Sequence, residues 1–116
     1  MSSHALIQAA LDGHAPLVAV VGPRIWPDLA REGAPYPLVV FKRTALERIT
    51  GLANVVLGTN ETFAVECWAH TRGDSVALSE LVFAALDAAG LCADLAEPDG
   101  IDPELLDRVT VLTVEI

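Results

Sequence analysis

Apolar and polar positions alternate with a period of two in the middle of the chain. Between Thr62 and His70 this alternation places an apolar set on one side of an extended strand and a more polar set on the other. The apolar set is Phe63, Val65, Cys67 and Ala69, and the other set is Thr62, Glu66, Trp68 and His70. The pattern predicts a strand whose apolar face packs under a helix.

A helix is predicted directly after this strand. Apolar residues recur with a helical period from Leu78 to Ala89, and Gly90 follows where helices commonly end. Asp74 or Ser75 would cap the start of the helix. We therefore expect a main helix over residues 74–89, lying across the apolar face of the strand.

Weaker patterns surround these two elements. A short first helix is predicted from His4 to Asp12, and the run Leu17–Val21 fits either one or two helical turns or a buried strand. A strand should start at Leu38 and run to Thr44, or to Arg48 if a hairpin extends from the sheet. Leu91–Leu95 allows a further short strand, and the alternating run Arg108–Ile116 predicts the last one. The sequence thus predicts a single α+β domain over residues 1–116, with a small, mostly antiparallel sheet of three to four strands. One main helix and a short N-terminal helix accompany it.

The connection between the two central strands is too long for an ordinary hairpin loop. It occupies residues 42–60, which we call the arm, and its middle, Leu52–Leu57, is apolar. Apolar residues in a long connection either fold back on the core or contact a partner, and the second case would make the arm functional. The residues predicted to form assembly contacts are Lys42, Arg43, Arg48, Leu52, Val55, Val56, Leu57 and, outside the arm, Trp68.

Charge and composition reduce the number of function classes that fit this chain. The chain of 116 residues is 53% hydrophobic and has a formal net charge of −9. An apolar small domain suits an oligomer better than a monomer, and an acidic one is a poor nucleic-acid binder. The arm is basic, whereas the acidic loop, residues 94–107, holds no basic residue. Such opposite charges suit docking between copies, although a solvated acidic loop is the more common explanation.

No pattern predicts a catalytic, metal or cofactor site. Cys67 and His70 are three positions apart on a strand, so they should point to opposite faces and cannot form a thiolate–imidazole pair. The acidic residues lack the ligand order of a calcium loop, and no glycine-rich phosphate loop is present. The N-terminus lacks the pattern of a signal peptide, and no apolar run could span a bilayer. We therefore expect folding in a reducing cytoplasm and no membrane contact.

Four segments together resemble a known family. They are Gly22–Pro27 (Gly-Pro-Arg-Ile-Trp-Pro), Pro35–Phe41 (Pro-Tyr-Pro-Leu-Val-Val-Phe), Val65–Ala69 (Val-Glu-Cys-Trp-Ala) and a helix with Leu78–Val82. In this order they resemble the small tail completion, or tail terminator, proteins of long-tailed bacteriophages and gene transfer agents. The resemblance extends from Leu6 to Leu86, and the acidic loop departs from the family pattern.

The resemblance implies a structural virion protein rather than an enzyme. Such proteins form a homo-oligomeric ring, commonly a hexamer, that caps the tail tube and presents a surface to the head-side connector. The implied partners are other copies of the chain, the tail tube protein and the head–tail connector protein, with DNA only passing through the ring. The implied location is the head-proximal end of the virion tail, after assembly in the host bacterial cytoplasm, and no cofactor is implied.

Two other functions remain open at this point. The first is a ferredoxin-like ligand-binding or regulatory module that dimerises through its sheet. The second is an enzyme subunit without catalytic residues of its own. A ring and a dimer differ in mass, so the oligomeric state separates the first from a tail protein.

Overall fold

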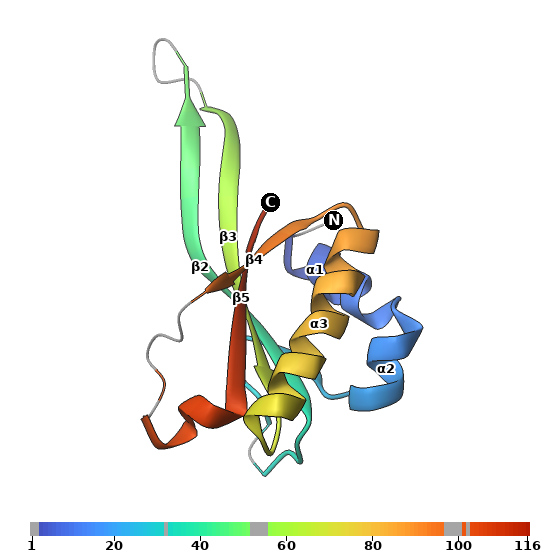
Figure 1. Cartoon of the computed structure of the whole chain (residues 1–116). Coiled ribbons are helices and arrows are strands. Elements are labelled where there is room, and N and C mark those ends of the chain that lie inside the picture. Colours follow the sequence, from blue (N-terminus) through green and yellow to red (C-terminus); the bar gives the residue numbers. More distant parts are fainter. Residues whose placement is uncertain (1–2, 32, 52–55, 97–100, 102) are drawn as a thin grey trace.

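The described residues form an α+β fold built on a mixed sheet of five strands. A computed structural model describes residues 3–31, 33–51, 56–96, 101 and 103–116. The elements are α1 (Ser3–Asp12), α2 (Ala15–Val21), β1 (Ile25–Pro27), β2 (Leu38–Thr50), β3 (Val56–Trp68), α3 (Arg72–Ala88), β4 (Cys92–Ala96), the 3₁₀-helix η2 (Pro103–Arg108) and β5 (Val109–Glu115). The strand order is β1-β2-β3-β5-β4, as can be followed in Figure 1.

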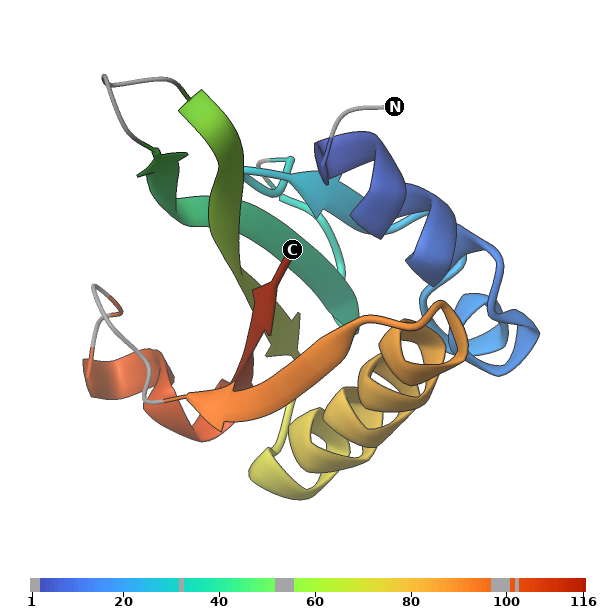
Figure 2. The ribbon, with the colours of Figure 1, turned by 90° about the horizontal axis from the view of Figure 1, so that it is seen from above.

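All three described α-helices cover one face of the sheet (Figure 2). The predicted apolar face of β3 lies beneath them, because Phe63, Val65 and Cys67 are fully buried there. The rest of this core comes from α1, α2, α3, β1, β2 and β5 and comprises Ile7, Leu11, Leu17, Val21, Ile25, Val39, Phe41, Leu78, Val82, Ala85, Leu86, Leu112 and Val114. Burial of this apolar surface is the main favourable term holding the two layers together.

The ends of α3 explain where the main helix starts and stops. The hydroxyl of Thr71 accepts a hydrogen bond from the backbone N–H of Asp74 (3.2 Å), so Thr71 is the N-cap and the helix begins at Arg72. The prediction of Asp74 or Ser75 as the cap was therefore wrong by one turn. Gly90, with φ of +80°, ends the helix as predicted, because it takes the left-handed conformation while the N–H of Leu91 bonds to the carbonyl of Leu86.

The predicted sheet was too small and too uniformly antiparallel. β1 pairs parallel to β2, with Ile25 opposite Val39, and β4 adds an antiparallel edge strand beside β5. A strand of three residues is too short to show an alternation, so no pattern in the sequence indicated the parallel pairing. The run Leu17–Val21 belongs to α2, with Pro16 in its first turn, which decides between the two readings in favour of the helix.

The order of the elements is not that of a ferredoxin-like module. β3, α3 and β4 form a split β-α-β unit in which β5 lies between two strands of the same direction. A ferredoxin-like fold contains this unit twice, in the order β-α-β-β-α-β. Here α1 and α2 precede the first strand, and β2 and β3 form a hairpin.

Candidate assembly surfaces

The arm is a two-stranded ribbon that projects beyond the body of the molecule (Figure 1). The pairing of β3 with β5 ends at Thr62, whereas β2 and β3 remain paired out to Thr50 and Val56. β2 thus follows the prediction for an extended hairpin and ends at Thr50, two residues beyond the Arg48 expected in that case and six beyond Thr44. Leu46 and Ile49 are 48% and 43% exposed on this ribbon. A hairpin without a third strand or a helix against it is marginal in water, so the arm is a surface suited to a partner.

A β-bulge at Thr44 sets the direction of the arm. Arg43 lies opposite Phe63 and Ala45 lies opposite Thr62, which leaves Thr44 as an extra residue in β2. Its hydroxyl donates a hydrogen bond to the carbonyl of Thr62 (3.2 Å). A bulge bends and twists its strand, and the extra residue exchanges the two faces of β2 beyond it.

The exchanged faces bring an apolar and a basic residue together. Beyond the bulge, Leu46 and Arg48 lie on the side of the sheet that carries the helices, and Glu47 and Ile49 lie on the other side. Without the bulge, the alternation begun at Leu38 would have placed each of these residues on the opposite side.

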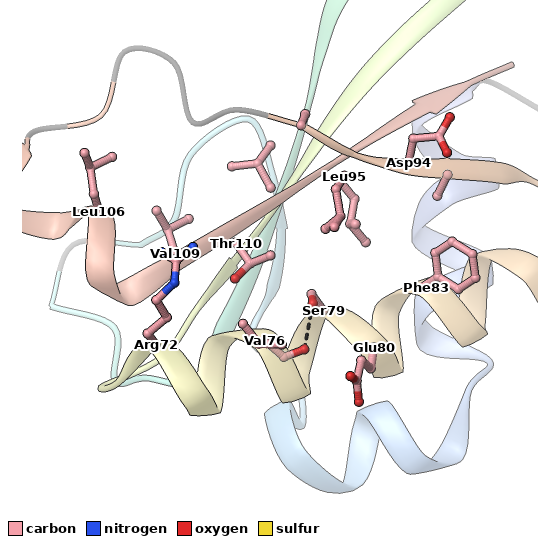
Figure 3. Close-up of a pocket in the computed structure, with 14 residues that line it drawn as sticks. Arg72, Val76, Ser79, Glu80, Phe83, Asp94, Leu95, Leu106, Val109 and Thr110 are labelled. Carbon is pink, nitrogen blue, oxygen red and sulfur yellow. Dashed lines mark hydrogen bonds between the residues drawn. The ribbon is translucent and has the colours of Figure 1, made fainter.

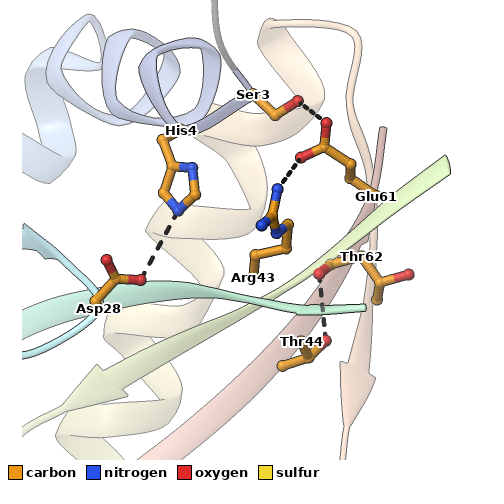
Figure 4. A network of polar contacts seen from close by, with 7 residues as sticks. All are labelled: Ser3, His4, Asp28, Arg43, Thr44, Glu61 and Thr62. Carbon is orange, nitrogen blue, oxygen red and sulfur yellow. Dashed lines mark hydrogen bonds and ion pairs between the residues drawn. The ribbon is translucent and has the colours of Figure 1, made fainter. Parts of the chain in front are cut away.

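Polar contacts fix the root of the arm to α1 (Figure 4). Ser3 Oγ donates to Glu61 Oε1 at 2.8 Å, and Arg43 Nη1 lies 3.7 Å from Glu61 Oε2. Beside this carboxylate, the ring of His4 packs edge-on against Phe63 and its Nε2 lies 3.8 Å from Asp28 Oδ1. One carboxylate thus joins β2, β3 and α1, so the ribbon leaves the body from an anchored base.

A second carboxylate organises the face of the sheet away from the helices. Glu66 is only 8% exposed and lies between Val40 and Val111 on the neighbouring strands. Lys42 Nζ is 3.0 Å from Glu66 Oε2, and the indole N–H of Trp68 donates to Glu66 Oε1 at 3.2 Å. Burial of a carboxylate is tolerated here because both oxygens have partners.

The aromatic residues near Trp68 form a small stack at the end of β3 opposite the arm. The rings of Tyr36 and Trp68 lie nearly parallel with centroids 6.2 Å apart, and His70 meets Tyr36 edge-on at 5.4 Å. Tyr36 comes from the segment that leads into β2, so the stack covers the start of that strand. Trp68 keeps partial exposure and remains available as a rim contact.

A groove of about 1080 Å³ lies between α3, the β4–β5 edge and η2 (Figure 3). Its apolar walls include the exposed side chains of Val76 and Phe83 on α3, Leu95 on β4 and Leu106 on η2. Leu95 is 75% exposed. Glu80 and Asp94 add acidic groups to the same groove, and Arg72 lies at the end near η2.

The predicted contact residues fall into separate places. Lys42 and Trp68 meet around Glu66, Arg43 lies at the root of the arm, and Arg48 projects from the ribbon. Val56 and Leu57 belong to the first part of β3. Leu52 and Val55 lie outside the described residues. As contacts with a partner, all eight remain predictions.

Sequence reasoning missed the residues of the groove and the apolar residues of the ribbon. Val76 and Phe83 are seven positions apart, so they form a second apolar stripe on α3 beside the buried one. This spacing could have been recognised in the sequence as a second apolar stripe. Leu95 carried no comparable signal, because its exposure depends on how far α3 reaches across β4.

Cys67 and His70 do not form a nucleophilic pair. Burial, with a smaller contribution from the charge of Glu66, raises the pKa of the Cys67 thiol far above its ordinary value, so the reactive thiolate does not form. His70 lies beyond the end of β3 and packs against Tyr36. Among the described residues, no three His, Cys, Asp or Glu side chains come together as metal ligands.

The described helices were compared with the length and apolar character needed to cross a bilayer. No single helix in the described part of the chain is long and apolar enough to cross a bilayer, whereas α1 and α2 would meet the length and composition test together, across a bend of 86°.

Comparison with known proteins identifies the family. The model of the family "Tail completion protein gp17" matches residues 5–111. Among solved structures, the gp17 protein of bacteriophage SPP1 has the same fold, with a TM-score of 0.59 and 21% sequence identity over 97% of this chain and 88% of that chain. No curated protein sequence matches. The family resemblance read from the sequence is thereby confirmed, and the chain belongs to the tail completion protein gp17 family, the structural proteins of the bacteriophage tail.

Proposed function

We propose that this tail completion protein forms a homo-oligomeric ring of six copies that caps the head-proximal end of the tail tube. In this role it stops the tube from growing and offers its other side to the head–tail connector. The ring assembles in the cytoplasm of the host bacterium. DNA passes through the ring, and the protein performs no catalysis.

The observation that carries the ring proposal is the arm. A ribbon with exposed Leu46 and Ile49 extends the molecule to 51 Å along its longest axis, against 31 and 24 Å along the others. Its root is held by the Glu61 contacts, so the ribbon points in a set direction. A projecting apolar element of this kind supports contact with a neighbour, as the family resemblance also implies.

The proposed ring needs two different surfaces on each copy. A contact between unlike surfaces repeats from copy to copy and closes when the rotation at each step allows it. The arm supplies one surface far from the body, and the body supplies the other. The Trp68 stack is left for the tube or the connector.

Electron microscopy of the purified protein, alone and mixed with tail tubes, tests this function. We expect rings in solution or bound at one end of each tube. The double variant Leu46→Asp with Ile49→Asp should keep the fold, as judged by circular dichroism, and lose the rings. A wild-type protein that forms no ring and leaves tube ends bare would overturn the proposal.

A further inference from the structure

We infer that the groove between α3 and β4 receives the arm of a second copy of this chain. This inference rests on the proposed ring and names the two surfaces that would meet in it. Six of the eight exposed large apolar side chains among the described residues lie on the ribbon or in the groove, and the other two are Val20 and Leu29. The ribbon projects from the body, whereas the groove is a hollow in it.

The dimensions of the two surfaces agree. From Ala45 to Thr50 the ribbon is about 17 Å long at ~3.4 Å per strand residue. From Arg72 to Phe83 the α3 wall of the groove is also about 17 Å long at 1.5 Å per helical residue. The open volume of about 1080 Å³ has room for several side chains of the ribbon.

The chemistry of the two surfaces is complementary as well. Leu46 and Arg48 share one side of the ribbon and are two residues apart, or about 7 Å. On α3, Phe83 and Glu80 are one turn apart, so Leu46 can pack on Phe83 and Leu95 while Arg48 meets Glu80 (Figure 3).

The charged groups required for this contact have no partner of opposite charge among the described residues of their own copy. Lys42 and Arg43 already pair with Glu66 and Glu61, whereas Arg48 makes no ion pair with any described residue. Glu80 and Asp94 likewise have no cationic partner in the described part of the chain. On a chain of net charge −9, the basic arm is the segment suited to an acidic groove.

A contact of arm with groove is heterologous, and this gives a sharp test. Leu46→Asp with Ile49→Asp damages only the arm, and Phe83→Asp damages only the groove. Each variant alone should stay monomeric in sedimentation velocity. In an equal mixture, the groove of the arm variant and the arm of the groove variant are both undamaged. These two surfaces can bind each other once, so we expect a dimer that grows no further.

Conservative variants separate this contact from a general loss of structure. Leu46→Met and Phe83→Leu keep an apolar side chain and should assemble like the wild type. Arg48→Glu and Glu80→Arg should each weaken assembly at least tenfold, and their combination in one chain should restore most of it.

The outcomes distinguish this inference from the proposed function. If the wild type and the Phe83→Asp variant both form rings, the arm-in-groove contact is wrong, whereas the proposed ring still holds. A mixture of the two damaged variants that stays monomeric, while the wild type forms rings, would overturn it too. A wild-type chain that forms no ring, free or on tube ends, would overturn both.

Discussion

At the scale of single residues, Glu66 shows how a charged side chain can hold one face of a sheet together. It lies between valines on both neighbouring strands, and Lys42 and Trp68 supply its partners. Lys42 is partly solvated, so solvent screens the ion pair. The value of Glu66 lies mostly in accepting the hydrogen bond of the partly buried indole N–H and in holding Lys42 at the start of the arm.

Removal of this carboxylate should lower stability by a moderate amount. We expect Glu66→Ala to reduce the free energy of unfolding by about 1–2 kcal/mol, because the indole N–H loses its acceptor. Glu66→Gln should cost less, since its amide oxygen can still accept that bond. Urea denaturation measures both, with Asp87→Ala, an exposed position on α3 outside the groove, as the control, for which a change below about 0.5 kcal/mol is expected. Equal stability of Glu66→Ala and the wild type would contradict the assigned role.

The two cysteines should differ in reactivity. Cys67 is buried with a raised thiol pKa, whereas Cys92 is exposed on β4. A raised pKa keeps the thiol protonated at neutral and mildly alkaline pH, so labelling at pH 8 should modify one thiol per folded chain and both thiols in urea. Mass spectrometry of the labelled protein gives the count. Rapid modification of Cys67 in the folded protein would show that the core opens.

At the scale of elements, the bulge in β2 decides which side chains of the arm lie on each face of the ribbon. Thr44 places Leu46 and Arg48 on the helix side of the ribbon. Because side chains alternate strictly along a strand, one inserted residue changes the face of every residue beyond it. The surface chemistry of the arm therefore depends on the register between β2 and β3 as much as on which residues the arm contains.

Deletion of Thr44 should disturb assembly more than folding. The deletion removes the extra residue and turns Leu46 and Arg48 to the other face, so we expect rings to be lost in electron microscopy while circular dichroism stays native. Thr44→Ala keeps the bulge residue and loses only the hydroxyl bond to Thr62, and it should assemble normally. Rings formed by the deletion variant would show that the face of the ribbon is unimportant.

At the scale of the whole molecule, two phenylalanines separate folding from assembly. Phe63 is fully buried between the sheet and the helices, whereas Phe83 is 47% exposed in the groove. A domain of this size has a total stability of about 5–15 kcal/mol, so the loss of one core aromatic ring is a large fraction of it. An exposed ring contributes little to that total.

Substitution of each ring by alanine should therefore have opposite effects. Phe63→Ala should lower the free energy of unfolding by about 3–5 kcal/mol through the cavity it leaves. Phe83→Ala should change it by less than about 0.5 kcal/mol and still weaken assembly. Urea denaturation and sedimentation velocity on the two variants give these values. A strongly destabilised Phe83→Ala variant would place that ring in the core instead.

The sequence determined the local elements and the family. The alternation over residues 62–70 and the helical period before Gly90 are local patterns, and backbone periodicity converts them directly into a strand face and a helix. The length of the connection between the central strands likewise indicated an arm. The family then followed from short motifs in a fixed order, which the match over residues 5–111 confirms.

Only the tertiary structure decided the rest, because it depends on pairs of residues far apart in the chain. The parallel pairing of Ile25 with Val39, the burial of Glu66 between Val40 and Val111, and the reach of α3 across β4 have no local signature. The bulge at Thr44 is visible only in the register between β2 and β3. The sequence alone thus predicted that the chain has an arm, and the packing of distant segments decided where it points and formed the groove that we propose as its binding site.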